Sequence, residues 1–263
     1  MDQSLRTAAR NRNVSDLYAL IQRNGNVLRR LDEVEIIDTA LHIAAEEGCT
    51  RFAMEMMNLK PSFARKLNHQ GLSPIHLALQ KGHTELVLCL MEIDKKLVRV
   101  KGKNGETPLH YISKVGNHDH LLDKFLEACS DCIRDVTTRN HTALHIAMEN
   151  RRLDVLQVLI KMLRKEDYCE EVVNRKDEDG NTALHLAAIV SNFKPKLKKQ
   201  IVSYVTKASS LIFPDIDNIS GDDGPDEVEF IDTPLDIAAE EGCMLFAMEM
   251  MNLKPSLKRD MYR

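Results

Sequence analysis

The stretch Thr39-Ala40-Leu41-His42-Ile43-Ala44-Ala45-Glu46-Glu47-Gly48 carries a pattern that recurs along the whole chain. Its core is Thr-x-Leu-His-x-Ala, and a later copy beginning at Thr233 has Asp236 in place of the histidine. The Leu or Ile of the core stands at positions 41, 75, 109, 144, 184 and 235, so the steps are 34, 34, 35, 40 and 51 residues. A period of this size indicates one extended array of stacked supersecondary units.

Composition excludes several classes of protein. The 263 residues include 36 Lys and Arg against 40 Asp and Glu, a formal net charge of −4, which gives no global electrostatic reason to bind nucleic acid. No apolar run approaches the roughly 18 residues of a membrane span, and the polar N-terminus argues against a secretory signal. Six scattered cysteines without a disulfide-like framework suit a reducing compartment, so we expect a cytoplasmic protein.

Each copy of the pattern reads as a short helix followed by a second one. The Thr or Ser is a favourable N-cap, and Pro74 and Pro108 stand at the first helical position. Glycines such as Gly48 and Gly82 end the helix, and turn signals at 68–71, 103–105 and 177–180 separate the units. These features predict an all-α repeat solenoid of helix pairs with short β-hairpin fingers.

The motif, the period and the turn glycines resemble ankyrin repeats over residues 1 to about 211. More narrowly, the stretches 1–9, 52–62 and 97–102 are similar to plant ankyrin proteins of the accelerated-cell-death and bian-da type, which are linked to defence signalling. This resemblance implies a protein partner on the concave face. Such relatives continue into a C-terminal membrane-spanning region, and we expect no direct span in these 263 residues.

We expect three regions along the chain. Residues 1–211 form the repeat array, with a degenerate N-terminal repeat at 1–30, and residues 212–229 form an exposed acidic linker. Residues 230–263 form a partial duplicated repeat, which suggests a truncated or fused gene product. Residues 227–256 repeat residues 33–62 with five differences in thirty positions, which are Ile36/Phe230, Ala40/Pro234, His42/Asp236, Thr50/Met244 and Arg51/Leu245.

The motif histidines could bind a metal ion or act in catalysis, but a structural role is favoured. Buried polar groups must be paired, so each imidazole is predicted to bridge the motif hydroxyl and a backbone group of an adjacent repeat. Consecutive repeats stack about 10 Å apart, which is too far for two of these histidines to share a zinc ion. The structural pairs are Thr39 and His42, Ser73 and His76, Thr107 and His110, Thr142 and His145, and Thr182 and His185.

A zinc site is the weaker alternative. Cys129 and Cys132 form a Cys-x-x-Cys, and His118 and His120 lie upstream of it, which leaves room for a zinc-dependent enzyme. No phosphate-binding, nucleophile-elbow or zincin motif is present in the sequence. We therefore expect no catalytic residue, no cofactor and no metal.

The repeat pattern favours a non-enzymatic protein–protein interaction scaffold, and the resemblance implies a role in plant defence or stress signalling. A membrane-tethered defence regulator whose anchor is missing from this chain is the alternative. The mixed charges of the expected concave face suit a protein partner better than nucleic acid. The partner-binding candidates are His69, Gln70, Leu72, Gln80, Lys81, Lys103, Asn104, Glu106, Lys114, Thr138, Arg139, His141, Glu149, Asn150, Glu178, Asp179 and Asn181.

Overall fold

The computed structural model describes residues 3–29, 36–116, 120–163, 169–183 and 185–186. The chain divides into two compact units, residues 1–143 and 144–263. The acidic linker predicted at 212–229 and the duplicated repeat predicted at 230–263 lie outside the described residues.

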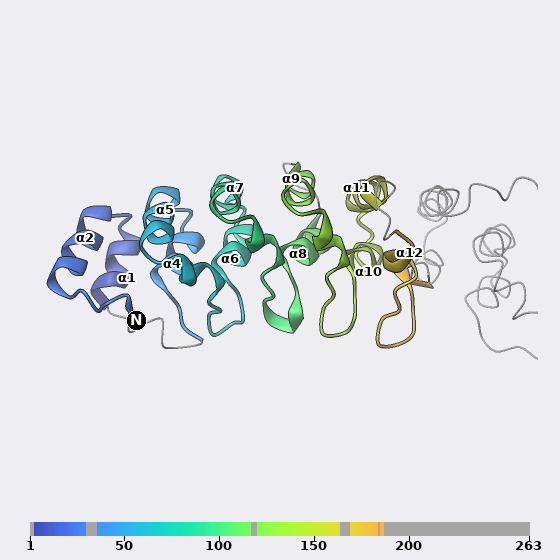
Figure 1. The fold of residues 1–263 in the computed structure, drawn as a ribbon, viewed down its shortest axis with the longest axis horizontal. Coiled ribbons are helices and arrows are strands. Elements are labelled where there is room, and N and C mark those ends of the chain that lie inside the picture. Colours follow the sequence, from blue (N-terminus) through green and yellow to red (C-terminus); the bar gives the residue numbers. More distant parts are fainter. Residues whose placement is uncertain (1–2, 30–35, 117–119, 164–168, 184, 187–263) are drawn as a thin grey trace, which may run out of the picture. The chain divides into compact units, whose positions relative to one another are not determined.

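Paired helices build the first unit, as the period predicts, and Figure 1 shows them as successive pairs in a row. Short 3-10 helices follow several second helices, and the described residues hold no strand beyond an isolated bridge between Ile36 and Leu67. The first unit comprises α1 (Gln3–Arg10), α2 (Val14–Arg23), α4 (Ala40–Glu46), α5 (Thr50–Leu59), η1 (Pro61–Arg65), α6 (Pro74–Gln80), α7 (Thr84–Ile93), η2 (Lys95–Arg99), η3 (Lys103–Gly105), α8 (Pro108–Val115), α9 (Leu121–Ala128) and η5 (Ser130–Arg134).

Helix α10 (Ala143–Glu149) begins at the boundary between the units. The second unit then holds α11 (Leu153–Leu163) and α12 (Cys169–Val173). In α11 the apolar residues recur at helical spacing, and five of its side chains are buried. The same helix-pair pattern therefore continues into the described part of the second unit.

The motif determines where each first helix begins and ends. In α4 the Thr39 side chain accepts a hydrogen bond from the backbone N–H of His42, and the His42 ring accepts one from the backbone of Thr39. This reciprocal arrangement satisfies two donors that a helix N-terminus leaves unpaired. The chain leaves the helix through a glycine with positive φ, which is 67° at Gly48 and 75° at Gly82. The predicted side-chain caps are confirmed at Thr39 and Thr107, whereas Ser73 makes no such cap bond, and the predicted glycine ends are confirmed at Gly48 and Gly82.

The first helices carry small side chains where they face one another, so they can stack closely. Ala44 and Ala45 of α4 are fully buried, and α4 packs on α1, α5 and α6. Larger side chains are buried on the elements that follow the first helix, such as Phe52 on α5 and Phe63 on η1. Small residues at the helix interface and large ones beyond it give the dense packing that stability requires.

The motif histidines join each first helix to the finger of the next repeat. The Nε2 of His42 lies 3.1 Å from the carbonyl oxygens of both Lys66 and Leu72. Further along, the same bond runs from His76 to the Glu106 carbonyl at 3.1 Å, from His110 to the His141 carbonyl at 3.2 Å, and, within the second unit, from His145 to the Asn181 carbonyl at 3.1 Å. The predicted bridge to an adjacent repeat is confirmed for these four histidines.

The tautomer of these rings follows from their partners. The backbone N–H groups of Thr39 and Thr107 lie 3.1 Å from the Nδ1 atoms of His42 and His110. A backbone N–H can only donate, so Nδ1 is the acceptor and Nε2 carries the hydrogen that points at the carbonyl. Burial disfavours the charged imidazolium and lowers the pKa of His42, His76 and His110 to about 4. The three rings are therefore neutral at physiological pH.

Ion pairs between side chains also link successive repeats, among them one from Lys81 to Glu46 at 3.3 Å. Arg65 pairs with Asp94. Arg99 forms a bidentate ion pair with Asp135, in which Nε donates to Oδ2 at 2.9 Å and Nη2 donates to Oδ1 at 2.5 Å. Exposed ion pairs contribute at most about 1 kcal/mol each, although a bidentate arrangement is the favourable case. They support the stacking that the buried histidine bonds specify.

Replacing one histidine should measure the strength of a link. We expect His76→Ala to lower the free energy of unfolding by about 1–3 kcal/mol, because buried polar groups of the Ser73 cap and the next finger lose their partner. Urea unfolding followed by circular dichroism checks this. His69→Ala is the matched control, because His69 is exposed on a finger tip and should change stability by less than about 0.5 kcal/mol. Equal stability of both variants would contradict the role assigned to His76.

The depressed pKa values also predict a pH dependence. Between the unfolded value of 6.5 and the folded value of about 4, the unfolded chain binds protons that the folded chain does not. Stability is therefore complete above about pH 6.5 and falls as the pH is lowered towards 4, by roughly 1–2 kcal/mol per histidine between pH 7 and pH 5. Urea titrations at several pH values measure the slope, and His76→Ala should make it shallower. A slope unchanged in that variant would argue against a neutral buried His76.

Candidate functional site

The fingers between the helix pairs are tight turns closed by backbone hydrogen bonds. In the first unit the N–H of Asn68 donates to the Leu72 carbonyl at 2.9 Å, and the N–H of Gly102 donates to the Glu106 carbonyl at 2.7 Å. The finger of the second unit closes in the same way, from Asp177 to the residue four positions on, at 2.8 Å. The Asp177 side chain also accepts two backbone N–H groups within its own turn. These local bonds give the tips a defined shape.

The fourth residue of each finger has the left-handed conformation. The φ angle is 76° at Gly71, 71° at Gly105, 60° at Asn140 and 83° at Gly180. Glycine takes this conformation without penalty, and asparagine is the residue that tolerates it next best. The prediction that Asn140 fills a glycine position is confirmed.

Neighbouring fingers of the first unit bind one another through their backbones. The N–H of Lys103 donates to the Gly71 carbonyl at 2.6 Å, and the N–H of Thr138 donates to the Asn104 carbonyl at 2.8 Å. The Thr138 hydroxyl adds a bond to the same Asn104 carbonyl at 3.1 Å. The tips are thus fixed relative to one another within this unit, so the side chains they carry form a pre-arranged surface.

Most of the predicted partner-binding residues are accessible on these tips and on the first helices. Leu72, Glu106, Asn150 and Asn181 are half-buried. Lys81 is exposed and forms an ion pair with Glu46 at 3.3 Å. The other exposed candidates are His69, Gln70, Gln80, Lys103, Asn104, Lys114, Thr138, Arg139, Glu149, Glu178 and Asp179.

The exposure expected for His141 is wrong, because its side chain is buried. His141 closes its finger at the same register as Leu72, Glu106 and Asn181, and all four carbonyls accept a histidine N–H from the preceding repeat. This link holds the end of each finger against the helix before it. The surface available to a partner therefore starts at the tip and excludes His141.

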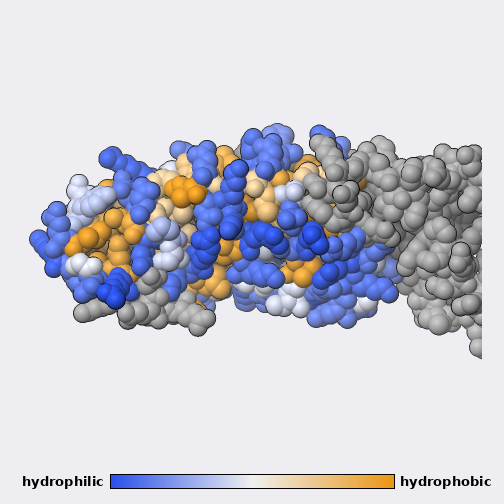
Figure 2. All heavy atoms as spheres, viewed as in Figure 1, coloured by the Kyte–Doolittle hydropathy of each residue, from blue (hydrophilic) through white to orange (hydrophobic). Residues whose placement is uncertain are grey.

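The sign of the finger charges changes between the two units. In the first unit the exposed tips carry Lys103 and Arg139, whereas in the second the described finger carries Glu178 and Asp179; exposed lysines, Lys101 and Lys176, stand just before a finger in both units. Lys101 is not among the partner-binding candidates chosen from the sequence. Its position just before Gly102, the first residue of a finger, could have identified it. Figure 2 shows polar residues over much of one face, with apolar atoms between them.

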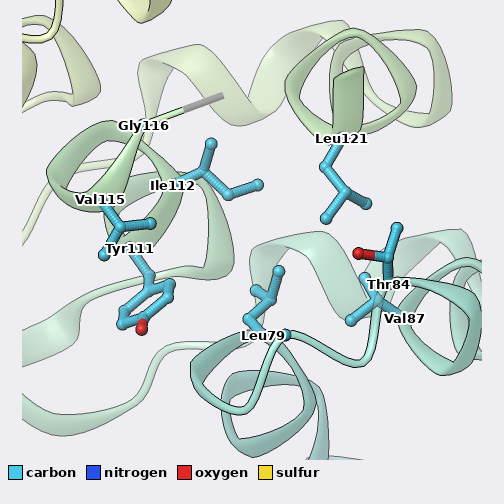
Figure 3. A pocket seen from close by; sticks show the side chains of 9 residues that line it. Leu79, Thr84, Val87, Tyr111, Ile112, Val115, Gly116 and Leu121 are labelled. Atoms are coloured by element: carbon cyan, nitrogen blue, oxygen red, sulfur yellow. The ribbon is translucent and has the colours of Figure 1, made fainter. Parts of the chain in front are cut away.

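An apolar cavity of about 120 Å³ lies between two helix pairs of the first unit. Figure 3 shows Leu79 from α6, Ile112 from α8 and Leu121 from α9 pointing into it. The sequence did not predict this cavity, which also has Val115 on its wall. It is formed by side chains from four helices, and no single spacing reveals it.

The cysteine pair has the environment of structural thiols. Cys132 is buried on η5, and burial raises the pKa of its thiol, which disfavours the thiolate that binds metals. Cys129 is half-buried, and His120 is exposed with its Nδ1 3.8 Å from Asp123, while His118 lies outside the described residues. Across the described part of the chain, no group of three His, Cys, Asp or Glu residues is placed to hold a metal ion. None of the described helices is long and apolar enough to cross a membrane.

Comparison with known proteins agrees with this geometry. The family profile for ankyrin repeats matches three times, over residues 5–99, 94–172 and 117–207. The chain is 46% identical over 206 residues to the ankyrin repeat-containing protein BDA1 of Arabidopsis thaliana, a match that covers 77% of this chain and 48% of that protein. The chain thus spans about half the length of the curated relative it matches.

Two solved structures share the fold at low sequence identity. An ankyrin repeat domain from Acinetobacter baumannii aligns with a TM-score of 0.59 and 22% identity, over 81% of this chain and 96% of that chain. A chain from the complex of a predatory endopeptidase with an immunity protein, from Bdellovibrio bacteriovorus, aligns with a TM-score of 0.56 and 20% identity, over 77% of this chain and 98% of that chain.

Alanine substitutions at two glycines with nearly equal φ angles should distinguish the effect of contacts between fingers from the effect of backbone strain. A Cβ added at Gly71 would lie 3.0 Å from the Cβ of Lys103 and 3.3 Å from its Cα, whereas one at Gly82 would meet nothing within 4 Å. Both alanine variants carry the left-handed strain of about 1 kcal/mol. We expect Gly71→Ala to destabilise by a further 1 kcal/mol or so, because the bond between fingers must open. Urea unfolding of both variants checks this, and equal losses would show that the fingers do not constrain each other.

Proposed function

We propose that this chain, which belongs to the ankyrin-repeat family, is a non-enzymatic scaffold that binds a protein partner along its finger tips and first helices. The bonds between fingers are the observation that carries the proposal. A surface whose backbone is already fixed loses little conformational entropy when it binds, so more of the contact energy appears as affinity.

The division of roles within each repeat supports the same proposal. Backbone groups of the finger and the motif histidine maintain the stack. Tip residues such as Gln70, Lys103 and Arg139 are exposed and differ from one repeat to the next. Exposed, variable side chains on a rigid frame are the arrangement in which loops carry recognition.

Ankyrin-repeat domains are in general non-catalytic interaction modules, and that agrees with this surface. We place the scaffold in plant defence or stress signalling, within the cytoplasm, on the strength of the similarity to BDA1 and to plant ankyrin proteins of its type. The second candidate function is that of a membrane-tethered regulator. The observation favouring it is that the match covers only 48% of the relative. Sequencing the transcript beyond codon 263 tests it, and a stop codon there would exclude a C-terminal anchor.

A combined variant tests the scaffold proposal. Lys103→Glu, Arg139→Glu and Glu178→Lys together reverse the charge of three finger tips, and Leu72→Gln removes a half-buried apolar side chain at the base of a fourth finger. We expect this variant to lose partners that the wild-type chain retains in affinity purification with mass spectrometry from plant extract. The loss follows because reversed charges repel a surface complementary to the originals.

The control for this test changes the opposite side of the helix pairs. Arg51 on α5, Glu92 on α7 and Lys124 on α9 are exposed on second helices, so Arg51→Glu, Glu92→Lys and Lys124→Glu should leave the partners bound. Thermal melting by circular dichroism must show both variants folded. Retention of every partner by the folded finger variant would place the binding surface elsewhere.

A further inference from the structure

Two cysteines stand three residues apart at the start of η5, and the proposed scaffold uses neither of them. Cys129 directly precedes η5 and is half-buried, whereas Cys132 lies within η5 and is fully buried. Both are free thiols. Cys132 has the environment of a structural thiol, but part of Cys129 can be reached by a small molecule in solution.

The earlier repeats show that the fold requires a cysteine at neither position. The register of Cys129 carries two polar residues and that of Cys132 carries two large buried apolar residues, namely Lys60 and Asp94, and Phe63 and Leu97. Core packing alone can explain a small apolar thiol in place of a leucine. It does not explain a second cysteine, in the same turn, in place of a polar residue. The two substitutions together indicate a role that the thiols perform as a pair.

The backbone of the turn brings the two thiols within bonding reach. The N–H of Cys132 donates to the Cys129 carbonyl at 3.3 Å, so the two residues close a single 3-10 turn. Residues three apart in such a turn have Cα atoms about 6 Å apart, and a disulfide joins Cα atoms about 4.4–6.8 Å apart. Burial raises the pKa of the Cys132 thiol, and the Cys129 thiol raises it further, which requires the two groups to lie near each other.

The stack does not depend on the Cys129 sulfur. One repeat earlier, the Asp94 side chain accepts a backbone N–H of η2 at 3.0 Å and pairs with Arg65. The Cys129 side chain makes no cap hydrogen bond to η5. Arg99, which stands at the register of Arg65, forms its bidentate pair with Asp135 instead. The two links that a side chain makes at this register are thus made without Cys129, and its sulfur is available for reaction.

We propose that Cys129 and Cys132 form a reversible disulfide by exchange with a small disulfide such as glutathione disulfide, so that this turn is an oxidation site of the protein. The inference goes beyond the proposed scaffold function and does not rest on it. A small oxidant suffices, because only the partly exposed Cys129 has to meet it. A disulfide at a half-buried turn is open to the reverse exchange with reduced glutathione, which makes the oxidation reversible.

The exchange takes place in two balanced steps. The Cys129 sulfur, as the thiolate, attacks one sulfur of glutathione disulfide, whose S–S bond breaks, and the departing glutathione thiolate takes up the proton that Cys129 released. The Cys132 sulfur then attacks the Cys129 sulfur and displaces the second glutathione, which takes up the proton of Cys132. The two cysteines are oxidised, and one glutathione disulfide is reduced to two glutathione thiols. Cys132 needs no access to solvent, because the turn holds its target beside it.

The test exposes the purified full chain to glutathione buffers of decreasing reducing strength. After an acid quench, the remaining thiols are alkylated and each cysteine is followed by mass spectrometry of its peptide. Cys129 and Cys132 should lose alkylation together, and their shared peptide should lose two hydrogen atoms without gaining a glutathionyl group. Cys89 is the control within the chain, because it is half-buried like Cys129 but is the only cysteine of α7. At the buffer that oxidises half of the pair, Cys89 should be oxidised at least about tenfold less.

Three variants separate the two steps of the exchange. Cys132→Val removes the second thiol and keeps a small apolar side chain in the core, so Cys129 should retain a glutathionyl group. Cys129→Asp introduces the residue that the previous repeat carries as Asp94, and it should leave Cys132 reduced because burial shields that thiol. Cys89→Ser should leave the oxidation of the pair unchanged. Circular dichroism shows whether each variant is folded.

The proposal is overturned if Cys129 of the wild-type chain keeps a stable glutathionyl group, or if Cys132 stays reduced in every buffer that oxidises Cys129. Oxidation of Cys132 in the folded Cys129→Asp variant would also overturn it. The wild-type measurement decides the matter even where a variant does not fold. No partner protein takes part in the experiment, so its result and the fate of the scaffold proposal are distinguishable.

Discussion

The hydrogen bond from a buried imidazole to a carbonyl of the next finger is the constraint on which the array depends. The ring can donate there only because its other nitrogen is occupied by the N–H of its own helix cap, as at His42 and His110. One side chain thus fixes the start of a helix and the position of the following repeat together. Burial keeps the ring neutral, and neutrality preserves the acceptor that the cap requires. Helix capping and repeat stacking are therefore a single coupled feature.

This coupling leaves the rest of the repeat free to vary. The stack is held by backbone carbonyls, by caps and by small buried side chains, and apart from the Gly or Asn with positive φ these need no particular residue in the finger. Lys103 contributes its backbone N–H to the neighbouring finger, and its side chain remains exposed. The tips can consequently change charge from one repeat to the next without loss of order. The same freedom allows Val115 to replace the polar residues of other repeats and to form the wall of a cavity.

Features that depend on local conformation were predictable from the sequence, and features that depend on several repeats were not. The role of Asn140 could be recognised because tolerance of a positive φ angle depends on the type of that one residue. The ion pair between Arg99 and Asp135 could not be recognised in the sequence, because Arg99 ends η2 and Asp135 follows η5, the 3-10 helix after the second helix of the next repeat. His141 appeared exposed because its register was read as part of the tip, whereas the imidazole bond holds that residue at the base. The cavity depends on the sizes of side chains from four helices, and no sequence period predicts that combination.

The duplicated stretch, which lies outside the described residues, carries Asp236 where the first copy carries His42, and the effect of an aspartate can be worked out at position 42 itself. A carboxylate at the third helical position can accept a hydrogen bond from the cap N–H, as Nδ1 of His42 does. An ionised carboxylate carries no hydrogen to donate, and a carbonyl placed where those of Lys66 and Leu72 stand would repel it. At position 42 an aspartate would therefore preserve the capping half of the coupled interaction and remove the stacking half. The two roles of His42 can thus be separated chemically, because capping needs only an acceptor whereas the link to the following finger needs a donor.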